Sequence, residues 1–169
     1  MKTEQRSTDE VDALFRALSN AEMVEMIEDR YHGRLRRHVP EIISLATKVE
    51  RVHQEDSLSP KGLSAYLIQM WASLEPHLMR EEYMLFPAIK KGNYFTAKMP
   101  IRLMETEHHE QYEILKTIED FKEKYPLPAH ACRTWRALFE GLDTFSKELS
   151  EHLYIEDNVL FPRVLKELG

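Results

Sequence analysis

The sequence predicts an all-α protein, built as an antiparallel up-down-up-down four-helix bundle with a short N-terminal extension. The 169 residues include only five glycines, and neither an Asn-Gly nor an Asp-Gly turn occurs. Alternating runs of β-branched residues are also few, so little in the chain favours a sheet. Apolar residues instead recur at helical spacing over long segments, which are divided by stretches rich in turn-forming residues. Long helices joined by short connections favour antiparallel neighbours.

The helix boundaries follow from the turn-rich stretches and from one capping signal. Ser59 precedes Pro60, and this pair predicts the start of the second helix, because serine is a good N-cap and proline is tolerated at the first helical position. Elsewhere in a helix, proline bends or opens it. We expect such an effect at Pro40, Pro76, Pro87 and Pro162. In chain order, the helices are expected over about residues 20–53, 61–90, 101–124 and 130–167.

The predicted extension precedes the first long helix. Apolar residues recur there at helical spacing, at Val11, Leu14, Phe15 and Leu18. This pattern is consistent with a short helix docked on the bundle, and also with a frayed end. A chain of this length is long enough for one well-buried domain and short for two. We therefore expect an extension over residues 1–19 and one bundle domain over residues 20–169.

Composition excludes several classes of partner. The formal net charge is -6 and no sustained Lys/Arg stripe occurs, which argues against nucleic acid or an anionic membrane as a partner. No apolar run approaches the ~18 residues of a spanning helix, and the N-terminus lacks the apolar core of a secretory signal. The single cysteine, Cys132, cannot form an intrachain disulfide and is expected to be a small buried residue near a helix start. A soluble protein of the reducing cytoplasm is the expectation.

One polar motif occurs twice. His77-x-x-x-Glu81-x-x-x-Leu-Phe-Pro recurs 75 residues later, beginning at His152 with Glu156 as its carboxylate. A His and a Glu four residues apart lie on one face of a helix, about 6 Å of rise apart. Two such helices that face each other supply two imidazoles and two carboxylates. That set can hold a pair of metal ions.

Helix faces and heights select further ligands among the other histidines. On the third helix His108 lies on the apolar face, whereas its neighbour His109 faces solvent. On the first helix His32 and His53 share one apolar stripe but lie ~30 Å apart in a continuous helix, so one metal pair cannot take both. His32 comes to the level of the repeated motif. His53 lies near a turn and is expected to be a helix-end residue.

The six expected ligands meet at the centre of the bundle. They are His32, His77, Glu81, His108, His152 and Glu156. His38 and His130 are expected at the surface. Two ions, each with two histidines, could share both carboxylates as bridges at the ~3.5–4 Å separation common in two-metal sites. That arrangement leaves room for a solvent-derived bridge or an exogenous molecule.

Acidic and apolar residues adjoin these ligands in the sequence. Glu107 is compatible with orienting a ligand, with lining a route for a small molecule and with a solvated helix face. Glu82 is expected to point about 100° away from its neighbour, toward an edge of the bundle. The two Leu-Phe pairs of the repeated motif, at 85–86 and 160–161, are expected to be core packing beside the site.

The donor types narrow the choice of metal. Imidazole with carboxylate suits iron, zinc or manganese, whereas a structural zinc site is tetrahedral and often rich in thiolates. Ferritin-like carboxylate bundles use Glu-x-x-His and more carboxylates than histidines. The order here is His-x-x-x-Glu with four histidines, which makes a more histidine-rich site.

The motifs as a set resemble the hemerythrin-like domain. The resemblance rests on the repeated His-x-x-x-Glu-x-x-x-Leu-Phe-Pro, on Arg-Tyr-His at 30–32 and on Met-Glu-Thr-Glu-His at 104–108. Two further segments, Ala-Thr-Lys-Val-Glu-Arg-Val-His at 46–53 and Ser-Pro-Lys-Gly-Leu at 59–63, resemble the di-iron "repair of iron centres" family, also called YtfE or ScdA proteins. The resemblance covers about residues 22–166.

This resemblance implies a non-haem di-iron centre, oxo-bridged and carboxylate-bridged, with the six residues as ligands and Glu81 and Glu156 as the bridges. It also implies a role in nitrosative and oxidative stress, repairing or supplying iron to damaged iron–sulfur clusters, with iron–sulfur proteins as clients. That family usually carries an N-terminal domain with an adjacent cysteine pair, and no such pair precedes the bundle here.

Two other functions remain open from the sequence. One is a carrier or sensor of oxygen or nitric oxide, although such carriers usually have a fifth inward histidine and none is evident at the right height. The other is redox catalysis, for which electrons would come from another protein, because the chain has no Gly-rich nucleotide or flavin motif.

Overall fold

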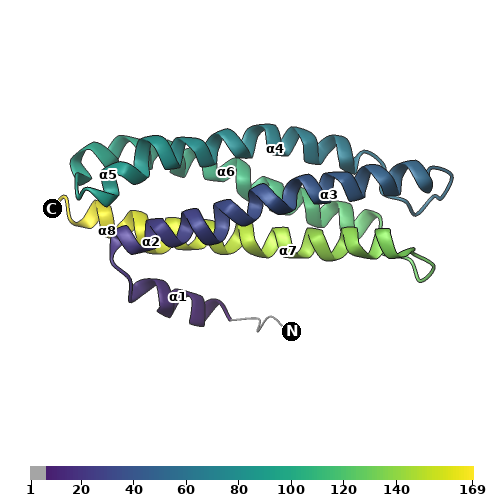
Figure 1. Cartoon of the computed structure of the whole chain (residues 1–169), viewed down its shortest axis with the longest axis horizontal. Coiled ribbons are helices and arrows are strands. Elements are labelled where there is room, and N and C mark those ends of the chain that lie inside the picture. Colours follow the sequence, from purple (N-terminus) through teal and green to yellow (C-terminus); the bar gives the residue numbers. More distant parts are fainter. Residues whose placement is uncertain (1–6) are drawn as a thin grey trace.

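The structure, a computed structural model, describes residues 7–169 apart from the side chain of Thr8. Four long helical rods lie antiparallel among these residues, with no strand between them (Figure 1). The first rod comprises α2 Asn20–Met26, η1 Ile27–His32 and α3 Gly33–Val52, and the second comprises α4 Leu63–Arg80, η2 Glu81–Leu85 and α5 Phe86–Lys90. The third is α6 Tyr94–Lys124, and the fourth comprises α7 Arg133–Ile155, η3 Glu156–Leu160 and α8 Phe161–Lys166. The η segments are π-helical. The predicted all-α, up-down-up-down bundle is confirmed.

The second rod begins later than predicted. Its α-helix starts at Leu63 after Gly62, whose φ of 83° lies in the left-handed region that glycine tolerates. The carboxylate of Glu50, at the end of α3, accepts hydrogen bonds from the backbone amides of Leu63 (3.0 Å) and Ser64 (3.2 Å). The prediction of Ser59 as N-cap is therefore wrong. A carboxylate from the preceding rod caps the helix, and a local sequence signal cannot contain that contact.

The third rod begins earlier than predicted. α6 starts at Tyr94 and runs through Pro100, which the sequence placed in a turn. Ala97 and Ile101, on either side of this proline, are fully buried. Their packing on the bundle outweighs the local tendency of proline to end a helix.

The prolines of the repeated motif open their helices as predicted. η2 lies directly before the Phe-Pro pair, and the amide of Phe86 donates to the carbonyl of Glu81, five residues back instead of four. Pro87 lacks an amide and its ring would clash with the carbonyl four residues before it, so a wider turn relieves the conflict. The same pattern recurs in η3 before Pro162.

At the other two prolines the helix does not open. Pro40 and Pro76 lie inside α3 and α4, which remain α-helical on both sides. The first rod opens elsewhere, in η1, where the amide of Gly33 donates to the carbonyl of Glu28 directly after His32. Each π-helical segment therefore begins or ends at a residue of the predicted ligand set. Such segments occur frequently at functional sites.

Two apolar clusters divide the bundle along its length. One contains Leu74 and Trp135 and lies toward the end where α3 meets α4, whereas the other contains Phe86 and Phe161 and lies toward the end with both α5 and α8. Each rod passes from one cluster to the other at the level of the predicted ligands. The polar site is thus enclosed by apolar packing on both sides.

The segment before the first rod forms a docked helix, α1 Thr8–Arg16. It lies alongside the bundle near α2 and α7 (Figure 1), and its Val11 and Phe15 are buried. The guanidinium of Arg163 donates hydrogen bonds to the carbonyls of Leu18 and Arg16, at 2.6 and 3.1 Å. Of the two alternatives for this segment, the docked helix is observed from residue 8 onward, and residues 1–6 lie outside the described part. Across residues 7–169, no helix combines the length and the hydropathy that a membrane crossing needs.

Candidate metal centre

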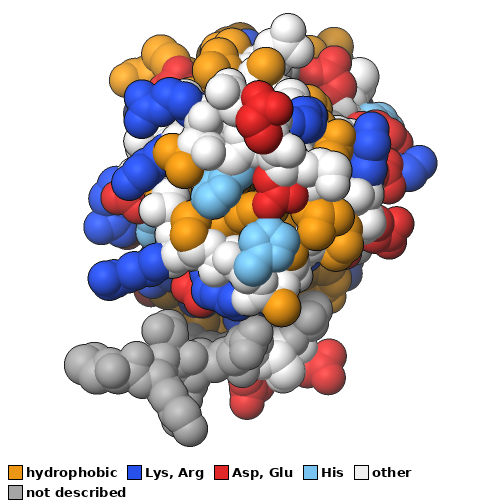
Figure 2. Space-filling model, turned by 90° about the vertical axis from the view of Figure 1, so that its right-hand side faces the viewer, with side chains coloured by type: hydrophobic (Ala, Val, Ile, Leu, Met, Phe, Trp, Pro, Cys, Tyr) orange, Lys and Arg blue, Asp and Glu red, His pale blue; other side chains and the backbone are white. Residues whose placement is uncertain are grey.

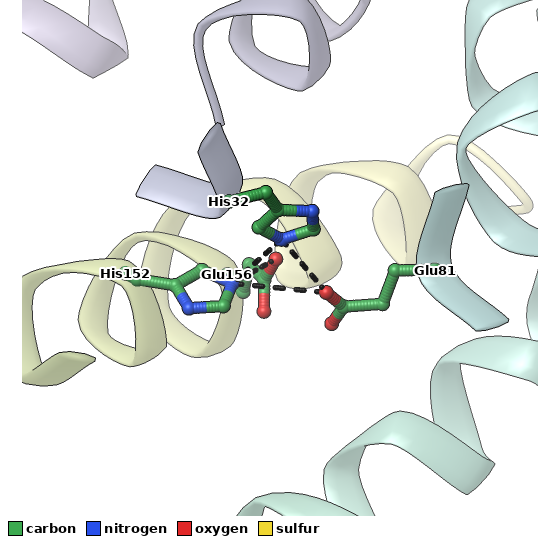
Figure 3. A group of neighbouring side chains, drawn as sticks. All are labelled: His32, Glu81, His152 and Glu156. Carbon is green, nitrogen blue, oxygen red and sulfur yellow. Dashed lines mark hydrogen bonds and ion pairs between the residues drawn. The ribbon is translucent and has the colours of Figure 1, made fainter. Parts of the chain in front are cut away.

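All six residues of the predicted ligand set meet at one level of the bundle. Each is at most 2 % exposed, and together they contribute side chains from all four rods. Two overlapping groups have ligand atoms within 4.8 Å of one another. The first group is His32, Glu81, His152 and Glu156, and the second is His77, Glu81 and His108. Figure 3 shows how the side chains of the first group point toward one another.

Glu81 contacts both groups through different oxygens. Its Oε1 lies 3.0 Å from Nε2 of His77 and 3.5 Å from Nε2 of His108. Its Oε2 lies 3.1 Å from Nε2 of His32 and 3.7 Å from Nε2 of His152. Each pair of imidazoles combines one histidine from each half of the bundle. This one carboxylate therefore faces two separate histidine pairs.

Glu156 is arranged in the same manner. Its Oε1 lies 2.9 Å from Nε2 of His152, and its Oε2 lies 3.2 Å from Nε2 of His108. Within the first pair, the Nε2 atoms of His32 and His152 face each other at 3.3 Å. Two nitrogens that both present a lone pair repel each other, whereas a shared cation or proton between them would satisfy both.

The donor atoms fit a metal cation. Nε2 of His77 and of His108, both carboxylate oxygens of Glu81 and Oε2 of Glu156 are buried, and they form no hydrogen bond of good geometry within the described residues. They nevertheless lie 3.0–3.5 Å from one another, as ligands directed at a common point would. Native proteins rarely leave several buried polar atoms unsatisfied in one place. A cation bound among these atoms would satisfy them.

The opposite ring nitrogens support the same assignment. Three of the four imidazoles direct Nδ1 at a carboxylate 2.6–2.7 Å away. The pairs are His32 with Glu82, His77 with Glu107, and His108 with Asp157. When Nδ1 donates its proton to a carboxylate, Nε2 keeps a lone pair for the metal, and the imidazole becomes more basic. This arrangement is typical of histidines that bind metal ions.

The sequence identified these outer carboxylates only in part. Glu107 contacts Nδ1 of His77, which agrees with the expected role of orienting a ligand. Glu82 lies on another face than its neighbour, as expected, but its contact with His32 and the contact of Asp157 with His108 were not predicted. The repeat contained the signal, because an acid directly follows the motif glutamate in both copies.

Glu82 and Asp157 each follow the glutamate of one motif copy, and each accepts a hydrogen bond from the rod of the histidine that it contacts. The donor lies one helical turn after that histidine. Arg36 donates two hydrogen bonds to Glu82, at 2.7 and 3.0 Å, and the hydroxyl of Tyr112 donates to Asp157 at 2.8 Å. Burial alone would raise the pKa of Glu82, but the hydrogen bonds from the imidazole and from Arg36 lower it to about 2. The carboxyl group of Glu82 is therefore ionised over the whole physiological pH range.

The inner carboxylates raise the pKa of His108 and of His152. Burial opposes a positive charge on His108, yet the hydrogen bond to Asp157 and the nearby carboxylate of Glu156 raise its pKa to about 12. Burial likewise disfavours a charge on His152, and the charge and hydrogen bond of Glu156 raise its pKa to about 9. Burial would raise the pKa of Glu81, but the surrounding histidines lower it well below the usual value. Protons therefore compete with a cation for this site.

The aromatic residues of the repeated motif pack against ligands. Phe86 stacks on His32, with ring centroids 5.7 Å apart and an angle of 23°, and Phe161 stacks on His108 at 5.7 Å and 15°. Both phenylalanines are fully buried. The prediction of core packing beside the site is confirmed.

A cavity of about 220 Å³ adjoins one side of the site, between α4 and α6. His77 forms part of its wall together with Arg80, Glu107 and Gln111, and Ser73 lies one turn away on α4. The Arg80 guanidinium donates to Glu107 at 2.9 Å. A small molecule in this cavity would lie against one of the candidate ligands.

His53 lies far from the site, at the end of α3, and is in neither metal-binding group. Its Nε2 is 3.3 Å from Sγ of Cys132, and its ring packs against Trp135. Cys132 is exposed, so the expectation of a buried cysteine is wrong, although it does directly precede a helix. It lies in the loop before α7, where no rod covers it. Figure 2 faces this end of the bundle, where histidine side chains lie at the surface.

The other histidines outside the site make local ion pairs or face solvent. His109 is exposed, as its helix face predicted. His130 is exposed and pairs with Asp56 at 2.7 Å, in agreement with the expected surface position. His38 is only half exposed, because its Nδ1 lies 3.2 Å from Glu148, a largely buried residue of α7. His38 therefore lies at the surface, as expected, but with one ring nitrogen beside a carboxylate.

Comparison with known proteins places this architecture in a family. The hemerythrin HHE cation binding domain matches residues 22–164. A protein of Haemophilus influenzae named "Probable iron-sulfur cluster repair protein" is 43% identical over 164 residues, which are 97% of this chain and 74% of that protein.

Two proteins named iron-sulfur cluster repair protein YtfE are similarly close. That of Enterobacter sp. is 42% identical over 155 residues, covering 92% of this chain and 70% of its own length. That of Escherichia coli is 44% identical over 151 residues, covering 89% and 69%. With a buried His/Glu cluster able to hold cations, and a family match over most of its length, this chain belongs to the hemerythrin HHE cation binding domain family.

Proposed function

We propose that this protein binds two iron ions at the centre of its bundle and supplies iron for the repair of damaged iron–sulfur clusters. The proposed ligands are His32, His77, Glu81, His108, His152 and Glu156. The observation that supports two ions best is the position of Glu81, whose two oxygens face two different histidine pairs. Glu156 repeats the arrangement. Both carboxylates would bridge the ions, with an oxo group as a further bridge.

Iron suits the donor set and the proposed task. Neutral imidazoles and carboxylates bind it firmly but reversibly, because every ligand can also take a proton. In this role iron is cargo as much as cofactor. The relatives named as cluster repair proteins support the same role here, and damaged iron–sulfur proteins would be the clients.

We further propose that the protein acts in the reducing cytoplasm under nitrosative or oxidative stress. The single cysteine forms no intrachain disulfide, which is consistent with such a compartment. Residues 1–19 would be an extension of the bundle domain at residues 20–169.

Iron analysis and an iron-transfer assay test this proposal. The purified protein should carry about two irons per chain, with oxo-bridge absorption when oxidised. The reduced, iron-loaded protein should restore the cluster of an apo iron–sulfur protein faster than an equal amount of free iron. Two adjacent histidines provide a matched pair of variants, because His108→Ala removes a proposed ligand whereas His109→Ala changes only an exposed side chain. Transfer no faster than from free iron, or equal iron content in the two variants, contradicts the proposal.

Binding of nitric oxide or oxygen is a second candidate function. The cavity of about 220 Å³ beside His77 supports it, because it has room for a diatomic molecule next to a proposed ligand. Stopped-flow spectra of the reduced protein under oxygen or nitric oxide distinguish the two. A stable, reversible adduct favours a carrier or sensor, and rapid oxidation with iron loss favours iron supply.

A further inference from the structure

The four imidazoles of the site do not have equal support. Three direct Nδ1 at a carboxylate. The fourth, His152, is fully buried, and its Nδ1 has no hydrogen-bond partner within residues 7–169. The ring of Tyr31 lies beside it instead, with centroids 6.0 Å apart and an interplanar angle of 16°.

The repeated architecture explains this difference from the sequence itself. His77 and His152 occupy the same position in the two copies of the motif. The acceptor for Nδ1 of His77 is Glu107, the residue just before the histidine of the third rod. The corresponding residue of the first rod, just before its histidine, is Tyr31. An aromatic ring therefore stands where the other half of the site has a carboxylate.

The phenol of Tyr31 does not replace the missing acceptor. Its hydroxyl donates to Glu151 at 3.1 Å, so it is engaged at the far end of the ring from His152. Phe15 of α1 packs near the same ring, with centroids 6.2 Å apart. Glu151 itself lines a surface cavity of about 230 Å³ with Val11. The Arg30 guanidinium also lies near this ring, 5.3 Å from its centroid, so the ring contacts both an apolar side chain and a cation.

A missing outer carboxylate weakens a metal ligand. The carboxylate fixes the imidazole tautomer and raises its basicity, and its loss typically lowers metal affinity 10–100-fold. In the pair of His77 and His108, both imidazoles have this support. In the pair of His32 and His152, only one does. The two histidine pairs therefore cannot bind equal cations equally.

We propose that the two cation positions differ in strength, that the position shared by His32 and His152 gives up its metal first, and that Tyr31 sets this difference as a positioning residue. The inference rests on the proposed binding of two irons. It identifies which of the two irons leaves more readily. The more strongly supported pair would keep its iron through the first delivery.

Access and ligand support predict opposite orders of release. The cavity beside His77 lies against the fully supported pair. If access to an iron acceptor governed release, iron held by His77 and His108 would leave first. If support governs release, as we propose, iron held by His32 and His152 leaves first despite the α1 helix that covers this flank.

Iron loss to a chelator distinguishes these orders. The protein is loaded anaerobically with two Fe²⁺ per chain and mixed with an excess of a chromogenic Fe²⁺ chelator. We expect two phases of equal amplitude, one iron each, with rates that differ about 10–100-fold. Glu107→Gln removes support from the other pair, so it should accelerate the slow phase and leave the fast phase unchanged. Tyr31→Phe keeps the ring and should change neither phase.

A second variant tests the role of Tyr31 directly. Tyr31→Glu places a carboxylate at the position equivalent to Glu107 and should slow the fast phase toward the slow one. Circular dichroism and thermal unfolding report whether this variant is folded, and Glu107→Gln decides the question if it is not.

The outcomes separate this inference from the proposed function. Loss of both irons in a single phase from the wild-type protein overturns the inference and leaves two-iron binding intact. Acceleration of the fast phase by Glu107→Gln also overturns it, because the first iron would then belong to His77 and His108. Failure to bind two Fe²⁺ at all contradicts the proposed function itself.

Discussion

The two halves of the bundle build the same inner site from different surroundings. The first half spans α2 to α5 and the second spans α6 to α8. Each contributes two histidines, one motif glutamate and one phenylalanine stacked on a histidine. The outer contacts differ. Arg36 donates hydrogen bonds to Glu82 in the first half, whereas Tyr112 donates one to Asp157 in the second. In addition, Tyr31 occupies the position in the first half that Glu107 occupies in the second. Cation binding constrains the inner residues in both halves alike, whereas the outer residues can vary and tune each half separately.

The stacked phenylalanines should give the largest effect on stability, and an equal one in each half. Both rings are fully buried beside a histidine. Phe86→Ala and Phe161→Ala should each lower the free energy of unfolding by about 3–5 kcal/mol, through lost burial and a residual cavity. Urea unfolding of the metal-free protein measures both. A difference of more than about 2 kcal/mol would show that the halves are not equivalent in packing.

The two motif glutamates should differ in their effect on metal content. Glu81 lies within 3.7 Å of all four imidazoles, whereas Glu156 lies within 3.2 Å of two. Glu81→Gln keeps the size of the side chain but removes its charge, and it should weaken binding of both cations by at least about 100-fold, or about 2.7 kcal/mol. Glu156→Gln should leave the group of His77, Glu81 and His108 able to bind one.

Metal analysis after equilibration with a buffered metal concentration measures this contrast. Zero metal in the first variant and about one in the second is the expected result. Equal metal content in the two would remove the distinction between the two motif glutamates.

Imidazoles with a raised pKa lie in both halves and should set the pH dependence of the metal-free protein, His32 in the first half and His108 and His152 in the second. The folded-state pKa values of His108 and His152 are raised to about 12 and about 9, above the ~6.5 of an unfolded chain. The stabilisation is therefore complete below about pH 6.5 and is lost as pH rises through the folded-state values. Between pH 7 and 9 the free energy of unfolding should fall by up to about 1.4 kcal/mol per pH unit for each imidazole.

Chemical unfolding at several pH values measures this slope. His108→Asn should reduce the slope of the free energy of unfolding against pH by the amount that corresponds to about one bound proton. Bound metal displaces the same protons, so the metal-loaded protein should show a shallower fall. A stability that rises between pH 7 and 9 without metal would contradict the assigned ion pairs.

Substitutions at the N-termini of α4 and α7 should give the smallest changes in the free energy of unfolding, and the two changes should have opposite signs. Glu50 caps α4 through two backbone amides, whereas Cys132 precedes α7 without a side-chain cap. Glu50→Ala should destabilise the protein by about 1 kcal/mol, and Cys132→Ser should stabilise it by about 0.5–1 kcal/mol, because serine is a preferred N-cap. Urea midpoints at constant slope report both changes. A stabilising Glu50→Ala would show that the carboxylate is not a cap.

Local patterns allowed the fold class and the convergence of the six residues to be predicted, because both depend on helical periodicity. A spacing of four residues places His77 and Glu81 on one face regardless of the rest of the chain. A rise of 1.5 Å per residue separates His32 from His53 by height. The boundaries of α4 and α6 were wrong for the opposite reason. Glu50 comes from another helix, and the burial of Ala97 and Ile101 depends on packing.

The outer contacts of the site depended on tertiary structure throughout. Glu82 and Asp157 each contact a histidine of a different rod, and a sequence pattern does not state which rods are neighbours at that level. The prediction of a buried Cys132 was wrong for the same reason, because burial depends on what another segment covers.

The sequence by itself determined that four helices would bring two His-x-x-x-Glu motifs and two further histidines to one level. Helical geometry is local, so the faces and heights of these residues follow from their spacing. Only the tertiary structure decided which oxygen of Glu81 faces which histidine pair, and that His152 packs against Tyr31 instead of a carboxylate. Those contacts join residues from different rods, and the packing of side chains between helices, which no single helix encodes, determines them.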